Sequence, residues 1–203
     1  PPRKGGAEAI GKILSPGQMV AVQAKNGILQ NDKDSADHKY PRVSMNITLP
    51  GRYLIYAPMS RDNYISQRIR EKKTRKQLLD MLHRLEGVEN CIMRAAALNT
   101  QTDVLVRENK LLREIWKRLQ EHFIGNAPQL IMEGPDAIQR ALSDNAAQTI
   151  GGIEVVTMEQ YESVEEWCEL YGPDLVTKIR PVELENPYAD LSLFYHRDVM
   201  GQI

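Results

Sequence analysis

The sequence predicts an α+β fold in three successive pieces. Alternating apolar residues and turns dominate up to Leu49, strands and helices mix as far as Asn126, and short strands then alternate with helices. A period of two indicates strands with one buried face, whereas apolar residues three and four positions apart indicate amphipathic helices. We therefore expect three units, at residues 1–49, 50–127 and 128–203.

Three strands are expected in the first part of the chain. Residues 19–23 alternate after a Pro-Gly turn, residues 42–49 alternate again, and a second Pro-Gly pair leads into a third strand at residues 52–57. The polar stretch 26–39 has no periodicity and is expected to be a loop. The residues expected to share one face of the second strand are Val43, Met45, Ile47 and Leu49.

Helical spacing begins after Ile69. A first helix is expected to end at Gly87, a residue that suits a left-handed C-terminal cap, and a short strand follows at residues 91–96. Thr102 or Asp103 is then expected to cap a long helix. The apolar stripe of that helix is Leu105, Leu112, Ile115, Leu119 and Phe123.

The last third is expected to alternate strand and helix. Short strands are predicted at residues 130–132, 153–157 and 176–182, with helices that start at Pro135 and at about Glu159. This order is typical of an α/β segment.

Composition argues against a uniformly basic nucleic-acid binder. The formal net charge of the 203 residues is −1, so any RNA affinity must come from local clusters of positive charge. The two cysteines, Cys91 and Cys168, have no CxxC spacing and are expected to be buried thiols in a reducing compartment. No apolar run reaches the length of a membrane span and no signal peptide opens the chain, so we expect a cytoplasmic protein with no membrane partner.

The densest positive charge is the segment RIREKKTRK. Such clusters neutralise phosphates and supply the salt-dependent part of RNA binding. Cations at a helix N-terminus oppose the macrodipole by up to about 1 kcal/mol each, which favours an anionic partner. The alternative interpretation is a solvated helix face. The cations of this basic run are Arg68, Arg70, Lys72, Lys73, Arg75 and Lys76.

Several segments resemble, in order along the chain, the ribonuclease E/G family. Residues 39–53, KYPRVSMNITLPGRY, are similar to the family stretch KGxRLTxxIxLPGRY, with Tyr40 in place of glycine. LIYAP at residues 54–58 matches a hydrophobic strand and its proline. ISQRI at residues 65–69 resembles ISRRI, and IMRAA at residues 92–96 resembles IVRTA.

The agreement continues to the end of the chain. Trp116 falls in the family's long helix, and LFYHRDVMGQI at residues 193–203 is similar to LF…IxxQI. The resemblance implies the C-terminal half of an OB-fold RNA-binding domain at 1–49, a 5′-sensor domain at 50–127 and part of an RNase H-like domain at 128–203. The abrupt start and stop of the sequence then indicate a piece of a longer protein.

The resemblance also implies an activity for the full-length protein. Members of this family are Mg²⁺-dependent endoribonucleases that cut single-stranded RNA in processing and decay and form homo-oligomers. The magnesium-binding aspartates would lie beyond this chain, and Asp174 and Asp190 are interpreted as cap or turn residues. The four histidines lack metal-ligand spacing and the family's zinc-binding cysteine pair is absent. We therefore expect a non-catalytic, metal-free, RNA-binding chain.

By the same resemblance, a 5′-monophosphate pocket falls on Arg94. Gly51 and Ile55 take positions that offer backbone groups, Gln67 takes the position of a further arginine, and Ala95 takes that of a threonine. A charge-assisted hydrogen bond to phosphate contributes roughly 1.5–3 kcal/mol. The missing hydroxyl and guanidinium therefore predict a weak, absent or altered pocket.

Two of these positions keep a structural alternative. Arg94 could instead form an ion pair with Glu71 or Glu89. Lys39 takes a lysine position that contacts single-stranded RNA in the family's OB-fold, and Tyr40 either stacks on a base or is an ordinary surface tyrosine.

Two functions from different classes follow. In the first, the chain is an RNA-binding portion of an endoribonuclease; in the second, its sensor has decayed into a structural scaffold or protein-interaction module. If the resemblance misleads, the chain is an unrelated α+β module, and Gly51, Arg68 and Arg94 should not converge.

Overall fold

The structure, a computed structural model, describes residues 10–26, 42–146 and 150–182. Its strands are β1 (Gln23–Asn26), β2 (Arg42–Ser44), β3 (Leu49–Pro50), β4 (Leu54–Tyr56), β5 (Tyr64–Ile65), β6 (Cys91–Met93), β7 (Ile153–Val155) and β8 (Ile179–Pro181). Its helices are α1 (Lys72–Arg84), α2 (Thr102–Glu121), α3 (Ala137–Asp144), α4 (Met158–Tyr171) and α5 (Pro173–Val176), with 3-10 turns η1 (Ile10–Lys12) and η2 (Ala95–Ala97). The predicted α+β class is confirmed.

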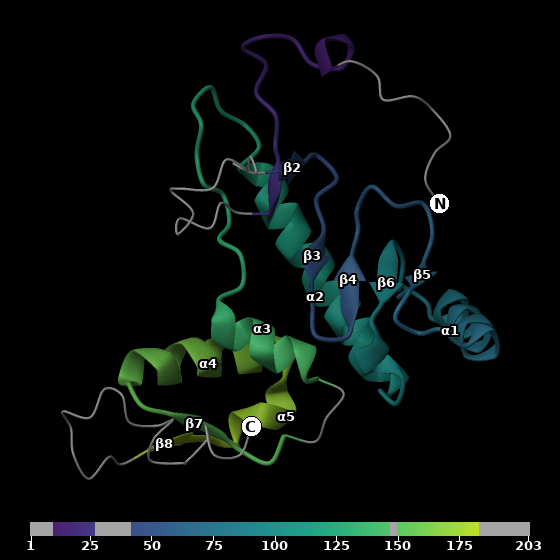
Figure 1. The fold of residues 1–203 in the computed structure, drawn as a ribbon, viewed down its shortest axis with the longest axis vertical. Helices are drawn as coiled ribbons and strands as arrows, with labels where there is room; N and C mark the ends of the chain where they lie inside the picture. The colour runs from purple at the N-terminus through teal and green to yellow at the C-terminus, as the bar shows by residue number, and fades with distance from the viewer. Residues whose placement is uncertain (1–9, 27–41, 147–149, 183–203) are drawn as a thin grey trace, which may run out of the picture.

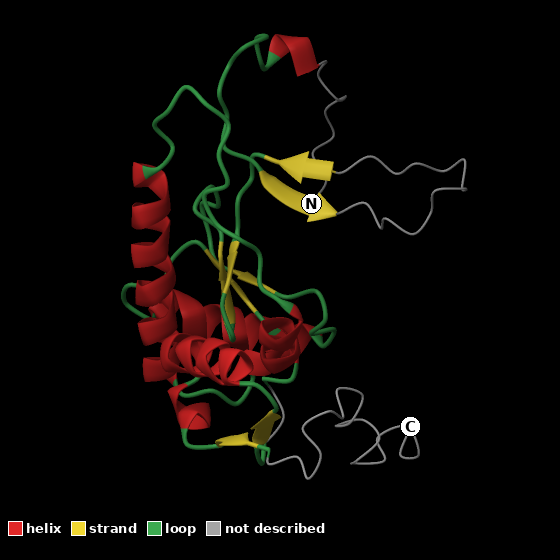
Figure 2. Cartoon of the chain, turned by 90° about the vertical axis from the view of Figure 1, so that its left-hand side faces the viewer, coloured by secondary structure: helices red, strands yellow, loops and turns green. Residues whose placement is uncertain are grey.

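The elements form three groups along the long axis of the molecule. The 3-10 turn η1 and the paired strands β1 and β2 lie toward one end, a four-stranded sheet with α1 and α2 occupies the middle, and α3, α4 and α5 lie with β7 and β8 at the other end (Figures 1 and 2). The long helix α2 runs beside the sheet in both views. None of the helices in the described ranges is long and apolar enough to cross a membrane.

The central sheet has the strand order β3-β4-β6-β5. β4 pairs antiparallel with β6, so that Ile55 lies opposite Ile92, and β5 pairs parallel with β6. Successive side chains of a strand point to opposite faces. Leu54 and Met93 therefore point into the core and are fully buried, whereas Ile55 and Ile92 lie on the other face and stay partly exposed.

Two hydrophobic cores stabilise the chain. The first joins the sheet to α1 and α2, and the second joins α3, α4, α5, β7 and β8; Tyr171 of α4 packs against both. The buried residues of the first core are Leu49, Leu54, Tyr56, Ile65, Ile69, Leu78, Leu82, Val88, Cys91, Met93, Ala97, Leu105, Leu112 and Trp116. Those of the second are Leu142, Val155, Val164, Trp167, Cys168, Leu175 and Ile179.

The helix predictions are mostly confirmed. Gly87 has a φ of 78°, as expected for a left-handed residue after α1. The predicted caps of α2 are wrong, because the N-cap is Gln101 and Thr102 already lies in the helix. Asp103 instead lies in the first turn, where its negative charge favours the helix dipole. Phe123 of the predicted stripe lies beyond the end of α2 and is 38% exposed.

The strand predictions were less accurate near the N-terminus. β1 begins at Gln23, where the predicted strand ends. The single strand predicted at 42–49 is divided into β2 and β3, because the backbone N–H of Ile47 donates to the carbonyl of Met45 (3.0 Å) and turns the chain. Val43 and Met45 are therefore exposed and do not share a buried face with Leu49.

The strand predicted at residues 130–132 is absent. These residues form no strand, and Leu130 is 76% exposed. Apolar character alone cannot distinguish a short strand from a connecting segment that has no pairing partner.

Candidate functional site

Strand alternation sets one side of the candidate site. Ile55 of β4 and Ile92 of β6 share the outer face of the sheet, and Arg94, two residues after Ile92, continues on that face. The backbone N–H of Arg94 donates to the carbonyl of Tyr53 at 2.8 Å, which ties the arginine to the turn before β4. The predicted convergence of Arg94 with residues 51–55 therefore follows from sheet pairing.

A buried carboxylate fixes that turn. Glu108 of α2 is 4% exposed and accepts backbone N–H bonds from Arg52, Tyr53 and Leu54 at 2.6–3.2 Å. Burial raises the pKa of Glu108, although these three amides and the charge of Arg94 oppose the shift. A Cβ at Gly51 would lie 2.8 Å from Cδ and Oε1 of Glu108, so only glycine allows this close approach. The GRY part of the LPGRY motif, together with Leu54, thus forms the binding position of the Glu108 carboxylate.

The loop after β5 forms the next wall. The guanidinium of Arg75 donates to the carbonyls of Ile65, Ser66 and Ile69 at 2.6–3.1 Å. Ser66 is fixed further because its N–H donates to the carbonyl of Met93 at 2.9 Å. Arg75 therefore positions the loop that carries Arg68.

Helix α3 brings the opposite wall to the sheet. Its N-cap Asp136 accepts from the N–H of Gln139 (2.7 Å), and the Gln139 side chain accepts in return from the N–H of Asp136, which forms a capping box. The apolar side chain of Leu142 anchors the helix in the second core. The last two residues of α3, Ser143 and Asp144, then reach Arg94.

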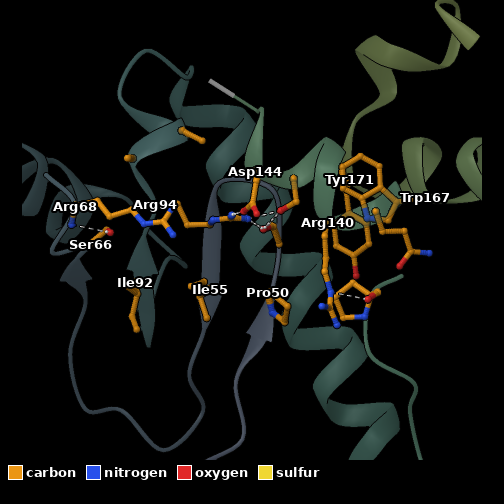
Figure 3. A pocket seen from close by; sticks show the side chains of 16 residues that line it. Pro50, Ile55, Ser66, Arg68, Ile92, Arg94, Arg140, Asp144, Trp167 and Tyr171 are labelled. Carbon is orange, nitrogen blue, oxygen red and sulfur yellow. Dashed lines mark hydrogen bonds and ion pairs between the residues drawn. The ribbon is translucent and has the colours of Figure 1, made fainter. Parts of the chain in front are cut away.

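These elements enclose a cavity of about 390 Å³ (Figure 3). Its wall carries three arginines and one carboxylate, so the net charge of the lining side chains is positive. The charged residues are Arg68, Arg94, Arg140 and Asp144. The residues that line it are Pro50, Gly51, Ile55, Ser66, Arg68, Ile92, Arg94, Ala95, Ala96, Pro135, Gln139, Arg140, Ser143, Asp144, Trp167 and Tyr171. An oxyanion is the ligand that clustered guanidinium groups of this kind fit best.

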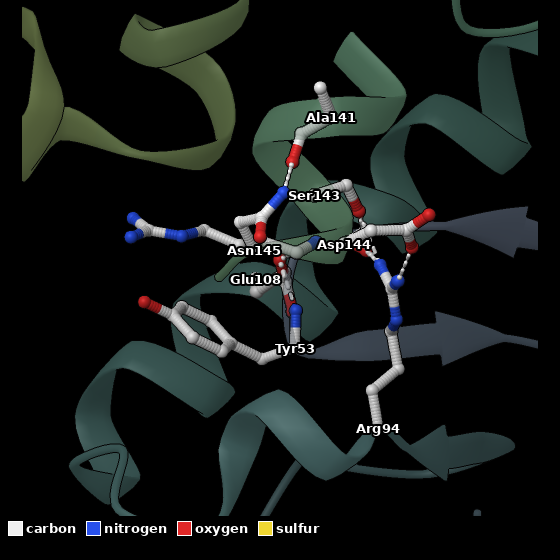
Figure 4. Close-up of polar contacts among 9 residues, drawn as sticks. Tyr53, Arg94, Glu108, Ala141, Ser143, Asp144 and Asn145 are labelled. Carbon is white, nitrogen blue, oxygen red and sulfur yellow. Dashed lines mark hydrogen bonds and ion pairs between the residues drawn. The ribbon is translucent and has the colours of Figure 1, made fainter. Parts of the chain in front are cut away.

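Arg94 is held by three acceptors in this cavity. Its Nη1 donates to the carbonyl of Gly51 at 2.7 Å and to Oγ of Ser143, and its Nη2 donates to Oδ1 of Asp144 at 2.8 Å (Figure 4). The structural alternative for Arg94 is therefore realised, but with Asp144 and not with Glu71 or Glu89. The Arg94 side chain is 17% exposed and that of Asp144 is 64% exposed.

A second arginine also bridges the two cores. Arg52 donates from Nη1 and Nη2 to the two carboxylate oxygens of Asp174 at 2.6 and 3.3 Å, and its guanidinium lies 5.0 Å from the centre of the Tyr53 ring. The pair lines a neighbouring cavity of about 660 Å³. Asp174 lies in the first turn of α5, and its ion pair gives it a role beyond the cap or turn expected from sequence.

The structure brings together part of the predicted site. Gly51, Ile55, Arg68 and Arg94 line the same cavity, whereas Gln67 is exposed and does not line it. Lys39 lies outside the described residues, as do Tyr40 and Asp190.

The basic run divides into two groups. Arg75 is committed to backbone carbonyls, whereas the other cations of the run are exposed. Within the described residues, Glu71 accepts a hydrogen bond from Thr74 (2.6 Å), and α1 has no acidic residue in its first turn. The exposed cations are Arg68, Arg70, Lys72, Lys73 and Lys76.

Both cysteines are buried thiols whose raised pKa disfavours the reactive thiolate form. Both are free and buried, as predicted, and burial raises the pKa of Cys91 to about 12 and that of Cys168 to about 11. In the ranges that the structure describes, no group of three or more His, Cys, Asp or Glu side chains could hold a metal ion.

Sequence reasoning missed Glu108, Arg140, Ser143 and Asp144. Glu108 carried one signal, a lone acidic residue on the apolar side of α2, three positions from Leu105. The other three lie on α3, forty or more residues from Arg94 along the chain. Only the tertiary fold brings them to the cavity.

Comparison with known proteins agrees with the family resemblance. The model of the ribonuclease E/G family matches residues 48–203. The chain is 30% identical to ribonuclease E of Synechocystis sp. over 154 residues, which covers 74% of the chain and 22% of that protein. It is 28% identical to ribonuclease E of Haemophilus influenzae over 188 residues (91% of the chain, 20% of that protein).

Ribonuclease G is similar over a comparable stretch. The chain is 27% identical to ribonuclease G of Escherichia coli K12 over 189 residues, which covers 90% of the chain and 36% of that protein. The chain thus spans 20–36% of the length of these relatives. On the match of its residues 48–203, the chain belongs to the ribonuclease E/G family.

Proposed function

We propose that this chain is a non-catalytic, RNA-binding portion of a single-strand-specific endoribonuclease, and that the cavity around Arg94 binds a 5′-terminal monophosphate. The observation that carries the proposal is the convergence of Arg68, Arg94 and Arg140 on one cavity beside the Gly51 turn. Family membership supports a ribonuclease role, and the arginine cluster supports an anionic ligand.

The chemistry of the cavity fits a terminal phosphate. A 5′-monophosphate carries about −1.5 to −2 charges at neutral pH and three acceptor oxygens. Arg94 offers a planar fork of donors, and Arg68 and Arg140 add positive charge from two other sides. The apolar wall formed by Ile55 and Ile92 suits the sugar or base of the first nucleotide.

The exposed basic residues supply the second part of the proposal. Lys72, Lys73 and Lys76 of α1 follow the loop that carries Arg68 and Arg70. Their charge is free to neutralise phosphodiester groups of a strand that enters the cavity, with a salt-dependent contribution to affinity. The 5′ end would then lie on Arg94 and the next nucleotides along this basic run.

A structural scaffold is the second candidate. The ion pair between Arg94 and Asp144 favours it, because the guanidinium already has an internal partner. Ala95 brings no hydroxyl to the cavity, and Gln67 lies outside its wall. In this case the chain would hold the remainder of the protein or a partner in place without sensing 5′ ends.

The test is the affinity of a short fluorescent single-stranded RNA with a 5′-monophosphate, compared with its 5′-hydroxyl twin, at low and high salt. We expect tighter binding of the monophosphate, and we expect Arg94→Ala to remove the preference without removing salt-dependent binding. Equal, salt-sensitive binding of both RNAs would leave only the basic surface, and no binding at either salt would support the scaffold.

The same proposal extends to the full-length protein. We assign residues 1–49 to the C-terminal part of an OB-fold, 50–127 to the 5′-sensor domain and 128–203 to part of an RNase H-like domain. Hydrolysis and the magnesium ion for it belong to parts of the protein outside this chain. Assembly into homo-oligomers and a cytoplasmic location complete the proposal.

A further inference from the structure

The guanidinium of Arg94 is in contact with an internal anion. Asp144 accepts from Nη2 at 2.8 Å, and Ser143 and the Gly51 carbonyl accept from Nη1. A carboxylate and a phosphate present the same kind of paired oxygens to a guanidinium. Asp144 therefore uses a donor that a phosphate in this cavity would need.

The three partners of Arg94 differ in how firmly they are held. The carbonyl of Gly51 belongs to a turn whose neighbouring amides bind the buried carboxylate of Glu108. Asp144, in contrast, is the last residue of α3, and its side chain is 64% exposed. Water can therefore solvate the carboxylate when it swings away, and an exposed ion pair of this kind is weak.

The charges of the cavity favour exchange for a more highly charged anion. Arg68 and Arg140 also lie on the wall, while the ion pair of Asp144 is with Arg94. A terminal phosphate has more charge than a carboxylate and more oxygens to distribute over several cations. A 5′-hydroxyl end offers no such anion.

We propose that Asp144 determines how strongly this cavity prefers a 5′-monophosphate, by competing with the phosphate for Arg94. The inference rests on the proposed function, because it assumes that the cavity accepts a terminal phosphate. Displacement of Asp144 is then part of binding, and its cost lowers the affinity for the monophosphate alone. RNA with a 5′-hydroxyl bears no such cost.

The decisive variant is Asp144→Asn in the full 203-residue chain. We expect the affinity for 5′-monophosphorylated RNA to rise about two- to tenfold, with little change for the 5′-hydroxyl twin. Glu133→Gln is the matched control, since it removes an equal charge from an exposed position outside the cavity wall. Asp144→Ser serves as a second variant if the asparagine variant melts at a lower temperature than wild type.

A double variant tests whether the gain in affinity depends on Arg94. Asp144→Asn in an Arg94→Ala background should change neither affinity, because the competed guanidinium is gone. Persistence of the gain without Arg94 would overturn the inference, as would an equal gain for both RNAs that Glu133→Gln reproduces. A wild type that prefers the monophosphate together with an unchanged Asp144→Asn variant would refute the inference alone. If wild type and both Asp144 variants all bind the monophosphorylated and the 5′-hydroxyl RNA equally, the proposed function is refuted as well.

Discussion

Two arginines bridge the two cores, and they differ in the burial of the guanidinium. Arg52 is 4% exposed and pairs with Asp174, whereas Arg94 is 17% exposed, pairs with Asp144 and faces a cavity. The two aspartates are alike, at 60% and 64% exposed. One pair therefore joins the two cores through a buried guanidinium, whereas the other leaves a partly exposed guanidinium on the wall of a cavity.

The surroundings of Arg52 explain its fixed position. The side chain packs on the ring of Tyr53, and a Cβ at Gly172 would lie 2.9 Å from its Nη1. Loss of the counter-charge of a buried arginine is costly, because the remaining ion has neither water nor a partner. Arg94, in contrast, lies on the wall of a cavity, and its side chain is 17% exposed.

The largest expected loss of stability comes from breaking the ion pair between Arg52 and Asp174. Asp174→Ala leaves the buried guanidinium without its carboxylate, so we expect the free energy of unfolding to fall by roughly 3 kcal/mol or more. Chemical denaturation measures this value. A loss below about 1 kcal/mol, as for exposed ion pairs, would remove the distinction between the two bridges.

The next largest loss of stability is expected at the turn around Gly51. Gly51→Ala places a Cβ 2.8 Å from the Glu108 carboxylate, so we expect a loss of about 1–3 kcal/mol in the free energy of unfolding. Gly134→Ala is the control, because a Cβ there meets nothing within 4 Å, and it should change stability by less than about 0.5 kcal/mol. Equal effects of the two substitutions would contradict the role of Glu108 as the anchor of the turn.

A smaller effect is expected in the pH dependence of stability, through the ion pair between Arg52 and Asp174. Burial would raise the pKa of Asp174, but its hydrogen bond and ion pair with Arg52 hold that pKa below the usual 3.8. A lowered pKa contributes stability above about pH 4 that is lost as the pH falls through the folded-state value. We expect the drop in unfolding free energy between about pH 5 and pH 3 to be smaller in Asp174→Asn than in wild type, by roughly 0.5–1 kcal/mol. An unchanged drop would argue against the Arg52 pair.

The smallest effect on stability is expected at the cavity. Asp144→Asn should lower the free energy of unfolding by less than about 1 kcal/mol, because the carboxylate is largely exposed and screened. The measurement is the same denaturation curve as for Asp174→Ala. A loss as large as that of Asp174→Ala would make Arg94 a structural residue and weaken the proposed pocket.

Sequence patterns predicted the parts of this molecule that depend on local order. The strands expected at residues 52–57 and 91–96 contain β4 and β6, and the glycine expected after the first helix has the left-handed backbone of Gly87. Turn residues and short apolar runs carry this information locally. Family resemblance placed Gly51, Ile55 and Arg94 together, and sheet pairing explains why they meet.

Long-range contacts could not be predicted in this way. Asp144 and Asp174 have no local sequence feature that distinguishes them from other exposed aspartates, and their partners lie 50 and 122 residues away. Arg75 resembles its neighbours in the basic run, yet it alone among them is shown donating to three carbonyls of the preceding loop. Such roles depend on which surfaces meet after folding.

An NMR titration of the arginine side chains with 5′-monophosphorylated RNA tests most directly whether Arg94 binds the terminal phosphate. We expect the Nε–H resonance of Arg94 to shift in a saturable manner while that of Arg52 stays in place, and we expect 5′-hydroxyl RNA to shift neither resonance. A titration in which Arg94 does not respond, or in which Arg52 responds equally, would contradict this expectation.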